Sequence, residues 1–260
     1  MRITRREALG LLWACPWAFP SMLAAEERPA RRSAKKGWAG NRPESAKQFG
    51  CSWWYDWGCS GKGSDGYEFV PMVKGNRKPV PAAEQARLSD PSAKHLLGFN
   101  EPERTSQGNL TVAQAIEAWP LMVALAEERK FRLGSPCVSS DGGGGAWMRE
   151  FMEQAQRKKL RIDFVAAHWY RSADPGAFED WLKELNANYR RPIWITEFNA
   201  MYTGADEAGH LQFLKGALRA LEKHRFVERY AYFNPASGKA ALLKDGELTK
   251  LGEAYRAAGD

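Results

Sequence analysis

The chain has 260 residues, of which 44% are hydrophobic and 27% charged, so it can bury one sizeable core and is too apolar for extensive disorder. Its formal net charge is +7, but residues 1–36 carry eight Lys or Arg against three Glu and so hold five of those charges. The remainder has no basic stripe interleaved with aromatic residues, which argues against nucleic acid as a partner.

Residues 1–25 have the composition of an export signal. A basic start (Arg2, Arg5 and Arg6) precedes an apolar stretch over 8–25 that two prolines interrupt, so the stretch is too short and broken for a membrane span. The Arg5–Arg6 pair suggests twin-arginine export, while the export route and lipidation at Cys15 stay open. The sequence therefore predicts a secreted or periplasmic bacterial protein.

Residues 26–48 are rich in charged and small residues and predict a flexible linker, so the ordered domain is expected over 49–260. A first strand is expected at 50–55 and another at 69–73, where Pro71 must lie near an end or an irregularity. One more strand is needed, within 58–67 or 78–88, and the sequence does not fix its place.

From residue 96 onward, apolar runs alternate with amphipathic helices. Strands are expected over 96–99, 131–138, 162–170, 193–198 and 227–233. Helices are expected over 112–129, 146–159, 175–188, 207–224 and 248–258, the first capped by Thr111 and kinked at Pro120. This alternation implies a parallel α/β sheet with crossover helices. Because polar residues end so many different strands, we predict a single (β/α)8 TIM barrel, with an irregular or reduced second strand.

Two of the expected strands end in a glutamate, Glu101 within Leu-Leu-Gly-Phe-Asn-Glu-Pro and Glu197 within Ile-Trp-Ile-Thr-Glu-Phe-Asn. The carboxyl ends of barrel strands are where such folds keep their chemistry. Two carboxyl groups about 5–5.5 Å apart are what retaining cleavage of a glycosidic bond requires. The sequence therefore predicts a glycoside hydrolase with Glu101 as the acid/base and Glu197 as the nucleophile.

Neighbouring residues make the two roles unequal. Asn100 is placed to donate to a sugar hydroxyl, and His168 and Tyr170 are placed to hydrogen-bond Glu197 and keep it ionised. Burial in an aromatic cleft and the like charge of Glu197 are expected to raise the pKa of Glu101.

Aromatic and polar residues at strand ends are the predicted substrate contacts, because indole and phenol rings stack on sugar faces. The chain has 11 tryptophans, and three of them crowd behind the first expected strand, where alternation turns one of the adjacent pair toward the core. The predicted binding residues are Asn100, Trp53, Trp54, Trp57, His168, Trp169, Tyr170, Tyr232 and Asn234. Tryptophans within the expected helices are assigned to the core: Trp119, Trp147 and Trp181.

Cys51, Cys59 and Cys137 remain after processing, and an odd number leaves at least one free thiol. Pairing of Cys51 with Cys59 stays open. The four histidines are scattered and no zinc-ligand spacing occurs. We expect no metal, no cofactor and a monomer.

Several motifs together resemble glycoside hydrolase family 128. They are the run from Gly98 through Glu103 to Thr111, and the segments 52–57, 69–73, 133–136, 168–170 and 194–198, which occur in the expected order. The resemblance spans residues 50–255 and implies a retaining barrel enzyme that cleaves β-1,3-glucan such as laminarin internally. It implies an acid/base that follows an asparagine on the fourth strand and a nucleophile that ends the seventh. Two positions depart from the family pattern: Glu103, where aspartate is expected, and Lys74, where tryptophan is common and where the change would alter a sugar subsite.

Two alternatives stay open. One is a catalytically weak, lectin-like barrel that binds β-glucan, which the presence of both glutamates disfavours. The other is a related glycosidase that acts on β-1,4-linked glycans. The sequence does not decide between internal and chain-end attack, nor the preferred chain length.

Overall fold

The computed structural model describes residues 32–64, 66–75, 86–87 and 89–259. The expected export signal lies outside these residues. Within the described part of the chain, no helix is long and apolar enough to cross a membrane.

Parallel strands form the framework. A six-stranded sheet has the order β3-β2-β1-β8-β7-β6, and β4 and β5 form a separate parallel pair. The bounds are β1 (Lys36–Ala39), β2 (Trp53–Tyr55), β3 (Glu68–Phe69), β4 (His95–Leu96), β5 (Arg132–Leu133), β6 (Val165–Trp169), β7 (Ile193–Phe198) and β8 (Val227–Phe233). Every pairing within these two sheets is parallel, as the alternation of strands and helices predicts.

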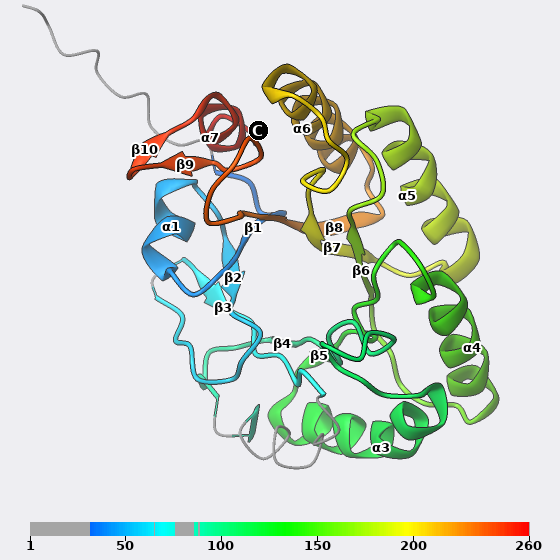
Figure 1. The fold of residues 1–260 in the computed structure, drawn as a ribbon. Coiled ribbons are helices and arrows are strands. Elements are labelled where there is room, and N and C mark those ends of the chain that lie inside the picture. The colour runs from blue at the N-terminus through cyan, green and yellow to red at the C-terminus, as the bar shows by residue number, and fades with distance from the viewer. Residues whose placement is uncertain (1–31, 65, 76–85, 88, 260) are drawn as a thin grey trace, which may run out of the picture.

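Isolated parallel bridges connect the two sheets. Met72 bridges to Leu97, which links the segment after β3 to the segment after β4, and Gly134 bridges to Phe164 between β5 and β6. Close approach needs a missing side chain at Gly98, where a Cβ would lie 2.6 Å from the carbonyl oxygen of Ser135. The strands thus follow one another around the middle of the molecule, with helices outside them (Figure 1).

The helices are α1 (Pro43–Gln48), α3 (Val112–Arg129), α4 (Gly144–Arg157), α5 (Pro175–Tyr189), α6 (Glu207–Lys223) and α7 (Lys250–Arg256). Helix α3 has the bounds that the sequence predicts, because Thr111 and Gln114 form a reciprocal capping box at its start. An antiparallel hairpin, β9 (Leu243–Lys244) and β10 (Glu247–Leu248), was not predicted.

Side chains pack on both faces of the strands. Two clusters lie on the side of the helices, one against α1, α5, α6 and α7 and the other against α3 and α4. A third cluster occupies the opposite face and draws Trp53, Tyr55, Phe164 and Trp194 from three strand regions. Burial of both faces explains why the strands read as continuous apolar runs.

The predicted linker over 26–48 is wrong for residues 33–48. Strand β1 lies between β2 and β8, and α1 follows it. The misleading signal is the Lys35–Lys36 pair. The ammonium group of Lys35 donates to the carbonyls of Leu221, Glu222 and His224 at the end of α6. These hydrogen bonds allow charged residues to lie at the start of a buried strand.

Strand β1 precedes the strand expected as the first. Of the two stretches expected to hold one more strand, the described residues of 58–67 contain only the isolated Ser64–Tyr67 bridge, and most of 78–88 lies outside the described part of the chain. Strand β3 ends at Phe69, before Pro71, as expected of a residue that lacks an N–H donor. The three cysteines of the described chain are buried, and no disulfide joins Cys51 and Cys59.

Candidate active site

The candidate site lies where parallel strands end. Glu197 is the penultimate residue of β7, Tyr170 follows β6 directly, and Trp57 follows β2 by two residues. Glu101 stands five residues beyond β4. Because all these strands run in one direction, their carboxyl ends share one edge and bring residues that are distant in sequence together.

Three side chains donate to the Glu197 carboxylate. Trp57 Nε1 lies 2.8 Å and the Tyr55 hydroxyl 3.1 Å from Oε1, and the Tyr170 hydroxyl lies 2.5 Å from Oε2. Burial and the charge of Glu197 raise the pKa of both Tyr55 and Tyr170 well above the ordinary phenol value, so both remain donors. The carboxylate is therefore fixed in orientation by three hydrogen-bond donors.

His168 lies between the two glutamates. Its Nδ1 is 3.1 Å from Oε1 of Glu101, and its Nε2 is 3.5 Å from Oε1 of Glu197, an ion-pair distance that falls short of a hydrogen bond. Burial alone lowers the pKa of His168, but the charges of Glu197 and Glu101 and a contact with Cys137 outweigh it and raise the pKa well above its usual value. The ring is thus a buried imidazolium that both carboxylates share.

The pKa of Glu101 moves opposite to the prediction. Burial raises it, but the hydrogen bond and charge of His168 and the charge of Arg104 prevail and lower it below the ordinary carboxyl value. The predicted rise in pKa took account of the like charge of Glu197 but not of the imidazolium between the two acids. Glu101 is therefore ionised when the site holds no substrate.

Two residues at this edge have a left-handed backbone conformation. Glu101 has φ 38° and Trp57 has φ 61°, a left-handed conformation that residues with a Cβ rarely adopt. The N–H of Glu101 donates to the carbonyl of Cys137 at 2.7 Å, which holds the strained turn in place. Such outliers persist where the surrounding structure imposes them, which is typical of functional sites.

Asn100 is 2% exposed, and its amide nitrogen lies 3.5 Å from Oε1 of Gln107. Its side-chain oxygen is buried and has no hydrogen-bond partner in the described chain. A polar atom left unsatisfied beside Glu101 is available to a ligand hydroxyl.

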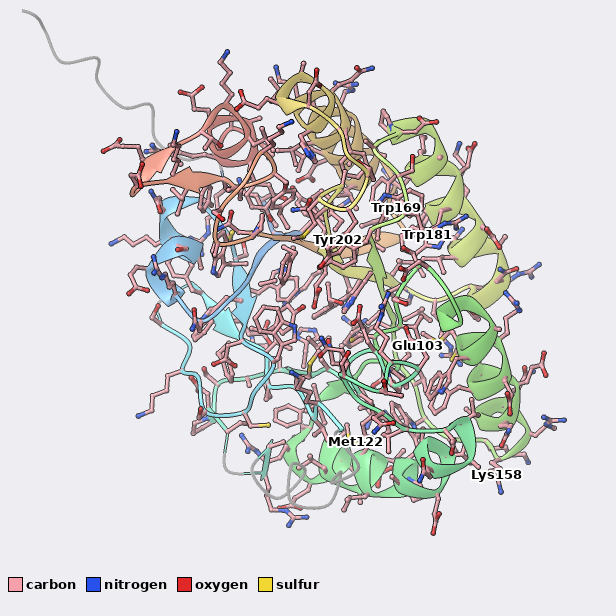
Figure 2. All side chains as sticks on the ribbon, in the orientation of Figure 1. Glu103, Met122, Lys158, Trp169, Trp181 and Tyr202 are labelled. Carbon is pink, nitrogen blue, oxygen red and sulfur yellow. The ribbon has the colours of Figure 1, made fainter. Side chains whose placement is uncertain are left out.

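Five predicted substrate contacts are not at the site. Trp53 is fully buried and stacks near Trp194, and Trp54 packs on Phe69. Trp169 lies beside Trp181 under α5, with ring centroids 5.1 Å apart (Figure 2). Tyr232 is buried and donates to the carbonyl of Ala240, while the Asn234 side chain accepts from the N–H of Leu242. Strand alternation directs Trp53, Trp54, Trp169 and Tyr232 into the core, whereas Asn234 is half-buried.

The helix tryptophans behave as expected of core residues. Trp119 is fully buried, Trp181 is 9% exposed, and Trp147 is partly buried and stacks on Phe151.

Sequence reasoning missed Tyr202, which is 74% exposed. It stands between β7 and α6, and Figure 2 shows it toward the middle of the molecule rather than among the outer helices. Its ring lies 5.7 Å from Tyr170, which lies 5.9 Å from Phe233, which lies 6.0 Å from Trp57. Aromatic rings therefore extend from the Glu197 carboxylate to solvent. The sequence does not indicate this role for Tyr202, because a single tyrosine in a loop forms no distinctive pattern.

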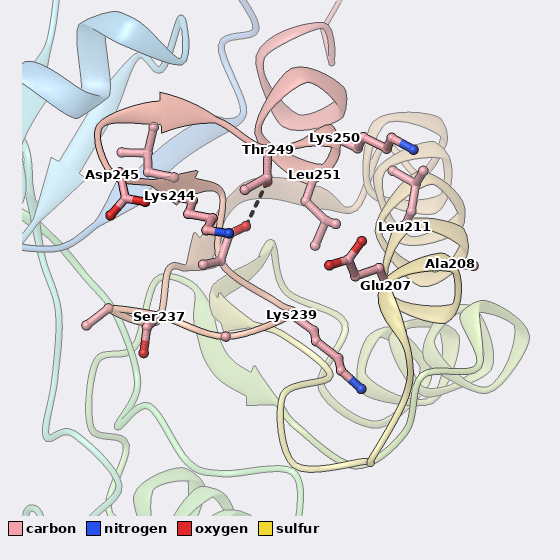
Figure 3. A pocket seen from close by; sticks show the side chains of 14 residues that line it. Glu207, Ala208, Leu211, Ser237, Lys239, Lys244, Asp245, Thr249, Lys250 and Leu251 are labelled. Carbon is pink, nitrogen blue, oxygen red and sulfur yellow. Dashed lines mark hydrogen bonds between the residues drawn. The ribbon is translucent and has the colours of Figure 1, made fainter.

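A separate hollow of about 870 Å³ lies between the start of α6, the segment after β8 and the start of α7 (Figure 3). Small apolar residues and the lysines 239, 244 and 250 line it, so it offers neither the paired glutamates nor an aromatic stacking surface. Within the described residues, no group of three His, Cys, Asp or Glu side chains could hold a metal ion.

Two carboxylates that flank a buried imidazolium, on an α/β fold with parallel strands, define a site of the glycoside hydrolase type. The chain belongs to the glycosyl hydrolase catalytic core family, whose sequence profile matches residues 33–255.

Solved structures confirm the resemblance to glycoside hydrolase family 128. A subgroup I endo-β-1,3-glucanase from Amycolatopsis mediterranei, bound to laminaritriose and laminaribiose, has TM-score 0.75 and 30% identity, covering 87% of this chain and all of that chain. A subgroup II endo-β-1,3-glucanase from Sorangium cellulosum has TM-score 0.75 and 28% identity over 86% and 98% of the two chains. A curdlan-specific exo-β-1,3-glucanase from Blastomyces gilchristii, subgroup III, has TM-score 0.72 and 33% identity over 88% and 99%.

Among curated proteins, Alkali-sensitive linkage protein 1 of Schizosaccharomyces pombe is 32% identical over 224 residues. The match covers 79% of this chain but only 40% of that protein, so the chain spans less than half the length of this relative.

Proposed function

We propose that the protein is a retaining endo-β-1,3-glucanase. The observation that carries the proposal is that Glu101 and Glu197, 96 positions apart in sequence, both lie within 3.5 Å of one buried imidazole ring. Convergence of two carboxyl groups on one small space is what double displacement at an anomeric carbon requires. The similarity to endo-acting β-1,3-glucanases supports the linkage and the mode of attack.

In this mechanism Glu197 attacks the anomeric carbon and forms a glycosyl-enzyme. Donation from Trp57, Tyr55 and Tyr170 holds its carboxylate in one orientation for the attack. Glu101 protonates the departing sugar oxygen and afterwards accepts a proton from the incoming water.

Glu101 must acquire a proton before the first step, since it is ionised in the free site. His168 is placed to supply it, because its Nδ1 lies 3.1 Å from Oε1 of Glu101. A bound sugar displaces water, strengthens the desolvation of Glu101 and so favours its neutral form. Sugar binding and proton transfer from the imidazolium are therefore coupled.

We assign Asn100, Trp57, Tyr170 and Tyr202 to substrate contact. The unsatisfied Asn100 oxygen accepts a sugar hydroxyl, and the exposed ring of Tyr202 stacks on a pyranose face.

We also infer that the sheet closes into a (β/α)8 barrel. The Met72–Leu97 and Gly134–Phe164 bridges, which connect the two sheets at both ends, support closure.

We further propose that residues 1–25 direct export, because a glucan polymer is an extracellular substrate.

The test is hydrolysis of laminarin by the pure protein. New reducing ends and a mixture of oligosaccharides are expected, and Glu197→Ala should lose at least about 1000-fold in rate, because no other group can form the covalent intermediate. A small external anion such as azide should restore part of that rate. Glu117→Gln on the exposed face of α3 is the matched control and should behave like the wild type.

Release of glucose alone from the first time points would indicate chain-end attack instead. Cleavage of β-1,4-linked but not β-1,3-linked glucans would contradict the linkage. Binding of laminarin without any new reducing ends would support a lectin-like protein and contradict the enzymatic proposal.

A further inference from the structure

Glu101 has a second cationic neighbour besides His168. Arg104 Nε lies 3.5 Å from Oε2 of Glu101, the carboxylate oxygen that does not face the imidazole. Each oxygen of the proposed acid/base is therefore paired with a positive charge. The Arg104 side chain is 40% exposed, so it lies partly in solvent.

Arg104 is fixed from a different loop. Its terminal nitrogen donates to the carboxylate of Asp141, which stands between β5 and α4. A second contact joins the same two segments, since the N–H of Ser139 donates to Glu103 at 2.8 Å. Two adjacent residues after Glu101 thus clamp the segment that follows β4 to the segment that follows β5, and Figure 2 shows Glu103 between the middle of the molecule and α4.

Charged and titratable groups from several described elements surround Glu101, and the buried Cys137 thiol also contacts His168. His168 on β6 and Arg104 favour its ionised form, and Asp141 opposes it. Glu197 on β7 acts through the shared imidazole, and the Tyr55 and Tyr170 hydroxyls lie close enough to be affected by the Glu101 charge. His168 is fully buried and also contacts Glu197, so it serves both acids, whereas Arg104 contacts Glu101 alone of the two.

We propose that Arg104, anchored by Asp141, sets the alkaline limit of the reaction by stabilising the ionised form of Glu101. The proposal rests on the acid/base role assigned to Glu101 above. Glu101 works as an acid only once it holds the proton that it takes from His168, and a fixed positive charge beside Glu101 opposes that uptake, so activity is lost at lower pH. Arg104 is a positioning residue in this account, since it acts through Glu101.

The decisive experiment measures kcat/KM for laminarin against pH at low ionic strength. In Arg104→Gln the alkaline limb should move upward by roughly 0.5–1 pH unit, because an opposite charge at this distance is removed from a partly exposed site. Arg104→Lys keeps the charge and should stay close to the wild type. Arg157→Gln removes an exposed charge at the end of α4 and should leave the limb in place.

Salt provides an independent readout. The difference between wild type and Arg104→Gln should shrink at about 1 M salt, where the screening length falls to roughly 3 Å. An alkaline limb that is unchanged in Arg104→Gln overturns the proposal, and so does a uniform drop in rate at every pH, which would indicate only a structural role for the clamp.

A titration that needs no activity separates this proposal from the proposed function. Carboxyl 13C NMR on protein labelled at glutamate Cδ follows Glu101 directly, with Glu101→Gln to assign its signal. The pH midpoint of the Glu101 titration should rise in Arg104→Gln and should keep its wild-type value in Arg157→Gln. If it rises in a protein that hydrolyses no glucan, the electrostatic inference holds and the proposed hydrolysis fails; if it does not rise, the inference fails.

Discussion

Several side chains at this site have roles that their positions in the sequence do not indicate. Trp57 and Tyr55 belong to the same short segment, yet they donate to a carboxylate 140 and 142 positions away. The left-handed backbone at Trp57 brings its indole N–H onto Glu197, while Trp53 and Trp54 face the core. Of these three neighbouring tryptophans, only Trp57 therefore lies at the site, because of its left-handed backbone conformation.

Tyr202 yields a prediction at this scale. Replacing it by alanine should lower kcat/KM for long β-1,3-gluco-oligosaccharides by about 3- to 10-fold, since an aromatic stacking contact contributes about 0.5–1.5 kcal/mol. The effect should appear mainly in KM, and Tyr202→Phe should retain wild-type values because the ring is kept.

Steady-state kinetics on laminarihexaose provide the measurement. Wild-type kinetics in Tyr202→Ala would show that no sugar ring rests there. An equal loss in Tyr202→Phe would assign the effect to the hydroxyl instead of the ring face.

Among the elements, long segments with clear periodicity were predictable and short ones were not. Helix α3 and strands β7 and β8 have the predicted bounds, because a capping box and continuous apolar runs are local signals. Strand β1 was missed because Lys35 beside it satisfies carbonyls at the end of α6 and Lys36 within it satisfies carbonyls at the end of α7, tertiary contacts without a local signature. The glutamate pair was predictable from strand ends, whereas the charge state of Glu101 depends on a histidine 67 residues away.

The placement of β1 can be tested through Gly37. A Cβ at this position would lie 2.2 Å from the Trp53 ring, so Gly37→Ala forces the indole out of a packed core. We expect a loss of about 1–3 kcal/mol in the free energy of unfolding, the usual effect of overpacking.

Urea unfolding of the variant against Gly145→Ala provides the comparison. A Cβ at Gly145 meets its nearest neighbour at 3.6 Å, an ordinary contact, and that variant should match or exceed the wild type. Equal stability of Gly37→Ala and the wild type would contradict the packing of β1 against β2.

On the scale of the whole molecule, the two ends of the parallel strands carry different groups of residues. The carboxyl ends carry the glutamates, and the opposite ends carry a charged network. There Glu68 accepts from His95 and Arg229, each at 2.7 Å, and Arg229 also covers the Trp194 ring at 4.5 Å. The network joins β3, β4, β7 and β8 far from the site, so it stabilises the fold and takes no part in the proposed reaction.

The network predicts how stability depends on pH. Burial alone raises the pKa of Glu68, but hydrogen bonds from His95 and Arg229 overcome it and lower that pKa to about 2. The unfolded chain protonates Glu68 near its ordinary value, so the stabilisation is complete above that value and is lost as the pH falls toward about 2.

Glu68→Gln should therefore reduce the free energy of unfolding by about 3 kcal/mol near neutral pH. The gap from the wild type should close progressively in acid, while Glu117→Gln shows no gap at any pH. Urea titrations across the acid range measure this, and a gap that stays constant down to the lowest pH would remove Glu68 as its source.

The stereochemistry of the first product tests the central claim most directly. Proton NMR of laminari-oligosaccharide hydrolysis, recorded within the first minutes, distinguishes the anomers before they interconvert. Double displacement by Glu197 and Glu101 predicts that the β-anomer appears first and the α-anomer later by mutarotation. Initial release of the α-anomer would require a water between the two carboxylates and would contradict the account.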